Sequence, residues 1–258
     1  MKIKIIILAL ITISSQSAFA QFAHFVTQGV IEFEKRVNTY ALIIEQMKRY
    51  PDDSFGTKVF EDYQKNNKQF RSLKSTLIFG NNQTLFTPIA ETVAQTNNWF
   101  NFPATQQNNT IFNSTLDGTS IAQKKIYEET YLLKDSTRKI DWKITTEMRE
   151  IAGYKCRRAN AIIMDSIYVV AFYTDLIPVS GGPEAFTGLP GMILGIALPK
   201  EHITWFATSV TDQTVTPDKL KAPVKGKPTD TKKLTAILQE ALKDWGKEAK
   251  ELLKIFLM

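Results

Sequence analysis

Between Ile121 and Val210 the chain consists of short apolar segments joined by connections of only a few residues. Antiparallel strands can be joined by a tight hairpin, whereas parallel strands need a crossover of about a dozen residues or more. The pattern therefore predicts an antiparallel meander. The predicted strands are residues 126–133, 140–148, 154–164, 167–174, 192–198 and 203–210, and the tight connections are residues 134–137, 152–153 and 165–166.

The predicted strand from Ile167 to Tyr173 is apolar on both of its alternating sets of side chains. Such a strand is covered on both faces, so another element must lie across the sheet. The C-terminal region supplies one, because a Pro- and Lys-rich linker at 215–228 precedes a predicted helix at 229–257. Its apolar side chains, Trp245 among them, recur every three or four residues, as on a helix with one buried face.

Packing of this helix on the sheet is favoured over an alternative in which it lies on a membrane surface or a partner. Asp244, Glu248 and Glu251 interrupt its lysines and argue against binding to anionic lipid. The predicted fold class is thus α+β, as a single domain at 21–258. It is a curved, half-barrel-like antiparallel meander of about six to nine strands with a long C-terminal helix on its concave face.

The N-terminal part adds a strand at 29–38, a helical insertion and a hairpin at 71–86. Residues 39–49 either extend the strand or begin a helix. Asp52, Asp53 and Ser54 are candidate N-caps of a helix that ends near Lys68. Residues 95–120 are rich in Asn, Gln and Thr, and we expect a long surface loop there.

The stretch from Ala171 to Pro199 carries the densest pattern of turn residues. Proline presets φ in a turn, and glycine accepts the positive φ that a type II turn requires at its third position. Residues 189–192 therefore predict a type II turn with Gly191 at positive φ. The candidate motif is structural and comprises Gly182, Pro183, Gly188, Leu189, Pro190 and Gly191.

The same stretch resembles the GLPGLI family of secreted bacterial proteins, whose motif appears as Gly188-Leu189-Pro190-Gly191-Met192-Ile193. Further blocks resemble family positions in the same order, at 29–34, 141–144, 151–159, 171–174 and 182–184. The resemblance implies an exported protein without an agreed activity. It therefore transfers no catalytic residue to this chain.

The N-terminus has the pattern of a secretory signal at 1–20. Lys2 and Lys4 precede an apolar core, and Ala18-Phe19-Ala20 is a small-x-small cleavage site. The core is too short to span a membrane. No cysteine follows it for lipid attachment, so we expect a periplasmic or secreted protein that is neither a lipoprotein nor membrane-spanning.

Loss of the two lysines of the signal lowers the net charge from +6 to +4. The basic residues are interspersed with acidic ones, which disfavours nucleic acid as a partner. Cys156 is the only cysteine, so an intramolecular disulfide is impossible. We interpret it as a small buried side chain, although Lys155, Arg157 and Arg158 leave a reactive thiolate as the alternative.

Motifs for nucleophilic catalysis, phosphate binding or a cofactor are not found, and His24 and His202 have no partner at metal-ligand spacing. We therefore expect no catalytic residue, metal or cofactor. The favoured function is a non-enzymatic envelope protein with an apolar groove for a lipid, an acyl chain or a partner peptide. The alternatives are a hydrolase using His202 with Asp175 and Glu184, or a structural partner of an envelope complex.

Overall fold

The computed structural model describes residues 24–49, 54–91, 102–106 and 109–258. A twelve-stranded sheet dominates it, with spatial order β12-β6-β5-β4-β3-β2-β1-β11-β10-β9-β8-β7. All pairs are antiparallel except β12 with β6. The strands are β1 Gly29–Asn38, β2 Phe70–Gly80, β3 Gln83–Pro88, β4 Asn109–Ser114, β5 Thr119–Ile126, β6 Glu129–Ser136, β7 Lys143–Ile151, β8 Tyr154–Ile163, β9 Ile167–Thr174, β10 Met192–Leu198, β11 Ile203–Asp212 and β12 Lys227–Thr229.

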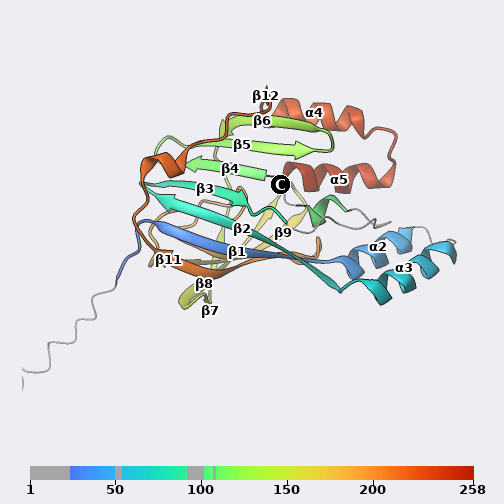
Figure 1. The fold of residues 1–258 in the computed structure, drawn as a ribbon, viewed down its shortest axis with the longest axis horizontal. Coiled ribbons are helices and arrows are strands. Elements are labelled where there is room, and N and C mark those ends of the chain that lie inside the picture. Colours follow the sequence, from blue (N-terminus) through green and yellow to red (C-terminus); the bar gives the residue numbers. More distant parts are fainter. Residues whose placement is uncertain (1–23, 50–53, 92–101, 107–108) are drawn as a thin grey trace, which may run out of the picture.

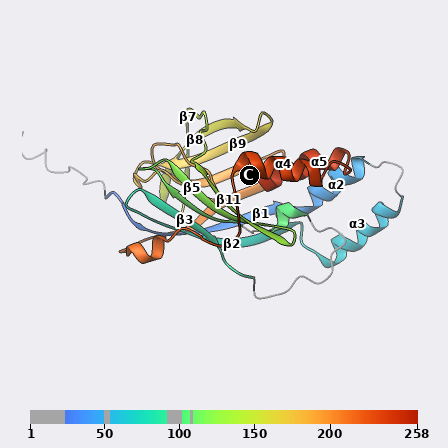
Figure 2. The same ribbon diagram turned by 90° about the horizontal axis from the view of Figure 1, so that it is seen from above.

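Four α-helices and two short 3-10 helices accompany the sheet. They are α2 Thr39–Arg49, α3 Ser54–Asn66, η1 Pro103–Thr105, η2 Pro217–Leu220, α4 Thr231–Ala241 and α5 Lys247–Leu257. Figure 1 and Figure 2 show α2 and α3 projecting beyond one end of the sheet, with α4 and α5 beside it. The sheet-dominated α+β class is confirmed, and the sheet is open, with β12 and β7 at its edges.

The core follows the alternation of side chains along the strands. In β1 the side chains of Ile31, Phe33 and Val37 are buried, as the period of two requires. In β9 all side chains except that of Tyr168 are buried, which confirms that this strand is covered on both faces. Leu234 and Leu238 of α4, together with Leu257 and Met258 at the end of α5, belong to the same core.

The first helix follows β1 without a loop, so the ambiguous segment 39–49 is helical. Asn38 accepts a hydrogen bond from the backbone N–H of Ala41 (3.1 Å), as an N-terminal capping side chain does. The ring of Tyr40 lies edge-on to Phe60 with ring centres 5.6 Å apart, and this contact joins α2 to α3. The candidate caps Asp52 and Asp53 lie outside the described residues.

The expected single C-terminal helix is in fact two short helices. Asp230 caps α4 by accepting a hydrogen bond from the N–H of Lys233 (2.7 Å). The helix ends at Ala241, and Gly246 then has a positive φ of 54° just before α5. The C-cap of α4 is Leu242, whose N–H donates to the carbonyl of Leu238, and Gly246 is the N-cap of α5. The break between them interrupts the continuous apolar stripe. Trp245 lies in the break and is 47% exposed rather than in the core.

Two further expectations are wrong in the same half of the sheet. The strand expected at 126–133 is interrupted by a hairpin turn at Tyr127 and Glu128, where Tyr127 has a φ of 53°. The polar segment 95–120 is partly a strand, because β4 lies between β3 and β5. Its polar side chains find partners inside, as when Asn109 donates to Glu184 (2.8 Å). The polar composition of β4 is typical of a loop, but in the fold these polar side chains are hydrogen-bonded.

The linker expected at 215–228 is held against the sheet over part of its length. Val215 and Leu220 are buried near Gly80, and β12 pairs with β6. No helix in the described part of the chain is both long and apolar enough to cross a membrane.

Candidate functional site

A cavity of about 610 Å³ lies between α2 and α5. Each helix contributes one face, because its lining residues recur every three or four positions. The short helix η1, the β5–β6 turn and the β10–β11 turn complete the wall. The lining residues are Leu42, Glu45, Gln46, Arg49, Phe102, Pro103, Ala104, Gln106, Lys125, Tyr127, Glu128, Lys200, Glu201, Trp245, Glu248, Glu251, Leu252, Ile255 and Phe256.

Three aromatic side chains form an aromatic rim, which comprises Tyr127, Trp245 and Phe256. The Tyr127 ring centre lies 5.3 Å from that of Phe256 and 6.4 Å from that of Trp245. Tyr127 and Trp245 remain 54% and 47% exposed. Both side chains stand in sharp turns, Tyr127 between β5 and β6 and Trp245 between α4 and α5. Exposed aromatic faces of this kind can stack against a ligand or bind a cation.

The wall of the cavity carries more acidic than basic side chains. Five glutamates line the cavity, against Arg49, Lys125 and Lys200. Some of these carboxylates have internal partners: Glu45 contacts His202 Nε2 (3.0 Å), and Glu251 pairs with Lys254 (3.3 Å). The wall therefore favours a ligand that carries positive charge over one that carries a carboxylate.

Glu201 is the least solvated of these glutamates. It sits in the β10–β11 turn and is only 9% exposed. Its Oε2 atom is buried and has no hydrogen-bond partner among the residues that the structure describes. Burial raises the pKa of this carboxyl, an effect that Lys254 and Lys200 oppose and Glu251 reinforces. An acceptor left without a partner is uncommon in a folded protein and requires an explanation.

A smaller cavity of about 50 Å³ shares lining residues of η1 and α5 with the first, and Lys35 and Glu184 also line it. Lys35 donates to the backbone oxygen of Gln106 (2.8 Å), and its ammonium lies 5.1 Å from the Trp205 ring centre. Burial lowers the pKa of Lys35 to about 8, although Glu184 raises it in part. The sequence indicated that Lys35 faces the core, because alternation along β1 places its side chain on the same face as those of Ile31 and Phe33.

The buried Lys124 and the half-buried Arg138 hold the end of α5. Lys124 donates to the carbonyl of Phe256 (3.1 Å) and Arg138 to that of Leu257 (2.6 Å). The last carbonyls of a helix lack intrahelical partners and carry the negative end of its dipole, so cations stabilise them. Burial lowers the pKa of Lys124 to about 8 and also lowers that of Arg138. These side chains thus dock α5, which forms one wall of the cavity.

The predicted motif lies away from the cavity and has an architectural environment. Gly191 has a φ of 145°, and a Cβ there would overlap the Thr174 carbonyl. The N–H of Gly191 donates to Leu189 (2.8 Å) and that of Met192 to Ile177 (3.0 Å). A type II turn would instead join Met192 to Leu189. The positive φ is present, whereas the predicted turn type is wrong.

The other motif residues are packed in the same way. A Cβ on Gly182 would lie 2.8 Å from the Ile193 side chain, and Gly188 faces Trp142, whose indole N–H donates to Thr187 (2.9 Å). Leu189 and Pro183 are buried, while Pro190 is exposed. These contacts give the stretch a role in joining β9 to β10.

The candidate catalytic group is not assembled by any contact among the described residues. His202 contacts Glu45. The buried Glu184 accepts a hydrogen bond from Asn109, and Asp175 is exposed after the end of β9. Cys156 is fully buried, which confirms its interpretation as a small buried side chain, and burial raises its pKa to about 12. No group of three or more His, Cys, Asp or Glu within the described ranges is arranged to hold a metal ion.

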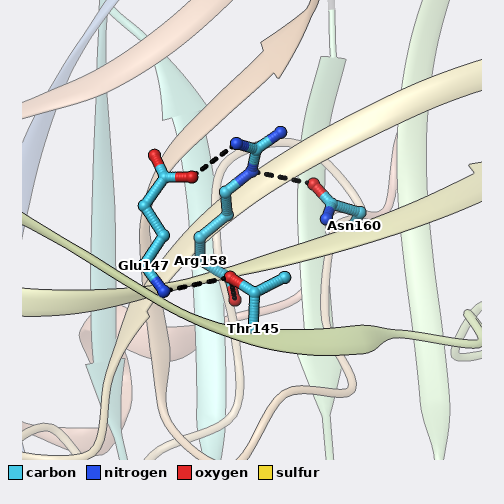
Figure 3. Close-up of polar contacts among 4 residues, drawn as sticks. All are labelled: Thr145, Glu147, Arg158 and Asn160. Carbon is cyan, nitrogen blue, oxygen red and sulfur yellow. Dashed lines mark hydrogen bonds and ion pairs between the residues drawn. The ribbon is translucent and has the colours of Figure 1, made fainter.

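A separate polar cluster lies on the sheet surface between β7 and β8 (Figure 3). Arg158 pairs with Glu147 (2.5 Å) and donates to Asn160 (2.9 Å), while Thr145 donates to the backbone oxygen of Arg158 (3.2 Å). The pairing register of the two strands shifts between Ile144 and Met148. The cluster therefore holds a bulge in an edge strand, and bulges of this kind hinder pairing with other chains.

Sequence analysis did not identify the residues of the cavity. The apolar spacing predicted Trp245 in the core. Glu201 stands in a polar turn beside the candidate His202, and no pattern there marked it as buried. The spacing of Leu42, Glu45 and Arg49 on α2 indicates a shared face, but not what that face borders.

Comparisons with known proteins are limited. A family model described as a protein of unknown function (Porph_ging) matches residues 162–195, which include the motif at 188–193. No curated protein matches the sequence. Two structures of PNGF-II resemble the fold with TM-scores of 0.49, at 16% and 13% identity over 80% and 88% of this chain. The chain spans about a third of PNGF-II, since the matches cover 32% and 33% of it.

An uncharacterized conserved protein from Thermus thermophilus is also similar. It has a TM-score of 0.38 and 5% identity, over 80% of this chain and 92% of that one. Similarities of this size carry no information on activity.

Proposed function

We propose that the protein is a member of the GLPGLI family that acts as an exported, non-enzymatic binding protein of the cell envelope. Its ligand is a peptide segment of a partner protein, bound in the cavity between α2 and α5. The signal pattern at 1–20 would direct it to the periplasm or the exterior. The observation that carries the proposal is the cavity of about 610 Å³, whose size suits a ligand of a few residues.

The chemistry of the wall favours a peptide over the lipid or acyl chain that the sequence also suggested. An acyl chain requires a continuous apolar wall, whereas here glutamates alternate with Leu42, Leu252 and the aromatic rim. Peptides combine apolar, polar and charged groups, and they bind to aromatic anchors flanked by polar residues. The mixed wall therefore matches a peptide.

The test begins with a random peptide library presented to the folded protein. Selected peptides are then measured by isothermal titration calorimetry against two variants that narrow the cavity, Gln46→Trp and Leu252→Trp. Ile162→Trp is the matched control, because this side chain on β8 is 66% exposed and does not line the cavity.

We expect Kd to rise at least about tenfold, or about 1.4 kcal/mol, in both cavity variants and to stay unchanged in the control. Equal binding to all four proteins, or failure to select any peptide, would show that the proposal is wrong. Native mass spectrometry that finds a retained lipid would support the acyl-chain ligand in its place.

A further inference from the structure

We propose that Glu201 is the anchor for a basic side chain, lysine or arginine, of the bound peptide, with the aromatic rim beside it. This assignment rests on the proposed function and specifies its ligand. The carboxylate of Glu201 would turn so that Oε2, which is buried in the free protein, faces the cavity and accepts from the charged group of the ligand. The aliphatic stem of that group would lie against Tyr127 and Trp245.

The first argument is the unpartnered oxygen. Glu201 is nine-tenths buried and lines the cavity, yet Oε2 accepts no hydrogen bond from the described residues. A buried carboxylate oxygen without a donor is unfavourable for the free protein. A donor brought by a ligand would remove this deficit, so the site favours cationic ligands.

The second argument is the distribution of partners among the neighbouring charges. Lys254 is close enough to affect Glu201, but its ammonium pairs with Glu251 (3.3 Å). Glu45 likewise contacts His202. The carboxylates of Glu251 and Glu45 therefore already have donors. Oε2 of Glu201 has none among the described residues, so a ligand can supply one.

The third argument is the aromatic rim. Tyr127 is held at a φ of 53°, a conformation that is unusual for a bulky residue, and its ring remains exposed beside Trp245. Rings of tyrosine and tryptophan attract ammonium and guanidinium groups and pack against their stems. An acidic anchor next to such rings selects lysine and arginine over neutral side chains.

The experiment uses three short peptides, acetyl-Gly-Lys-Gly-amide, acetyl-Gly-Arg-Gly-amide and the norleucine analogue acetyl-Gly-Nle-Gly-amide. Binding to wild type, Glu201→Gln and Glu150→Gln is followed by saturation-transfer NMR. Glu150 is the control because it is an exposed glutamate on β7 that does not line the cavity. Thermal unfolding of each protein is recorded in parallel.

We expect the basic peptides to bind wild type and Glu150→Gln at least about tenfold more tightly than the norleucine peptide. This preference should disappear in Glu201→Gln, while the melting temperature of that variant stays equal or rises because no charge is buried. A purely structural glutamate would lower the melting temperature and leave the preference intact.

Equal binding of the norleucine and lysine peptides to wild type would overturn the assignment without the use of any variant. Persistence of the preference in Glu201→Gln would also overturn it. If library peptides bind in the cavity without basic preference, the proposed function stands and only this assignment fails. If no peptide of either kind binds, both fail.

Discussion

Gly191 illustrates what a single residue contributes to the motif. Its φ of 145° lies outside the left-handed region where asparagine is tolerated, and a Cβ would overlap the Thr174 carbonyl. The sequence pattern predicted the positive φ of Gly191, because proline followed by glycine marks a turn. It could not predict the backbone of β9 at this position, since that contact joins distant parts of the chain.

Gly191→Ala should destabilise the protein by about 2 kcal/mol or more, since strain and overlap add. Gly153→Asn is the matched control, because Gly153 has a φ of 82° and open space around its Cβ position. That change should stay within about 0.5 kcal/mol. Urea unfolding measures both, and equal stability of the two variants would contradict the role of Gly191 in packing.

Lys35 makes the stability dependent on pH. Its pKa is about 8 in the folded state against an ordinary value of 10.5, so between these values the unfolded chain holds more protons. Stability therefore rises with pH across this interval, by up to about 3 kcal/mol from this residue. Below pH 8 both states are mostly protonated, and the cost of burying the charge is present in full.

Lys35→Met should remove the part of the rise between pH 8 and 10.5 that comes from Lys35 and leave the part that comes from Lys124, whose pKa is lowered equally. The exposed Lys125→Met should keep both parts. The measurement is the free energy of unfolding in urea at several pH values. A rise of equal size in Lys35→Met and wild type would exclude Lys35 as its source.

At the scale of elements, the strands were predicted best where turn residues and alternation agree. β1, β9 and β10 have the predicted bounds, and β7, β8 and β11 lie within a few residues of theirs. Tyr127 and Glu128 are not typical turn residues, which is why the β5–β6 hairpin was missed. β4 was missed because its polar side chains are satisfied by partners that only the folded chain supplies.

The C-terminal helices differ in what they contribute. Leu234 of α4 is fully buried, so Leu234→Ala should destabilise by about 2–5 kcal/mol. Trp245 in the break is half-exposed, and Trp245→Ala should cost less than about 1 kcal/mol while it weakens peptide binding. Thermal unfolding with calorimetric binding separates the two. If both changes destabilise the protein to a similar extent, Trp245 belongs to the core and this account of the break is wrong.

At the scale of the whole molecule, the sheet-dominated α+β fold was predictable from sequence, whereas the division of the C-terminal helix and the cavity were not. Local patterns specify which faces are apolar, and Leu234 and Leu238 do lie in the common core. The cavity is lined by α5, a helix separate from α4, and Lys124 and Arg138 hold the end of α5. These contacts join residues far apart in the sequence, and no local pattern announces them.

The central claim is that peptides bind between α2 and α5. A crystal structure of the protein with a library-selected peptide tests it most directly, because the sheet also offers two edge strands, β7 and β12, as competing sites. The account predicts peptide density in the cavity, with a basic side chain within hydrogen-bond distance of Glu201. A peptide added as a further strand along β7 or β12, with the cavity empty, would contradict it.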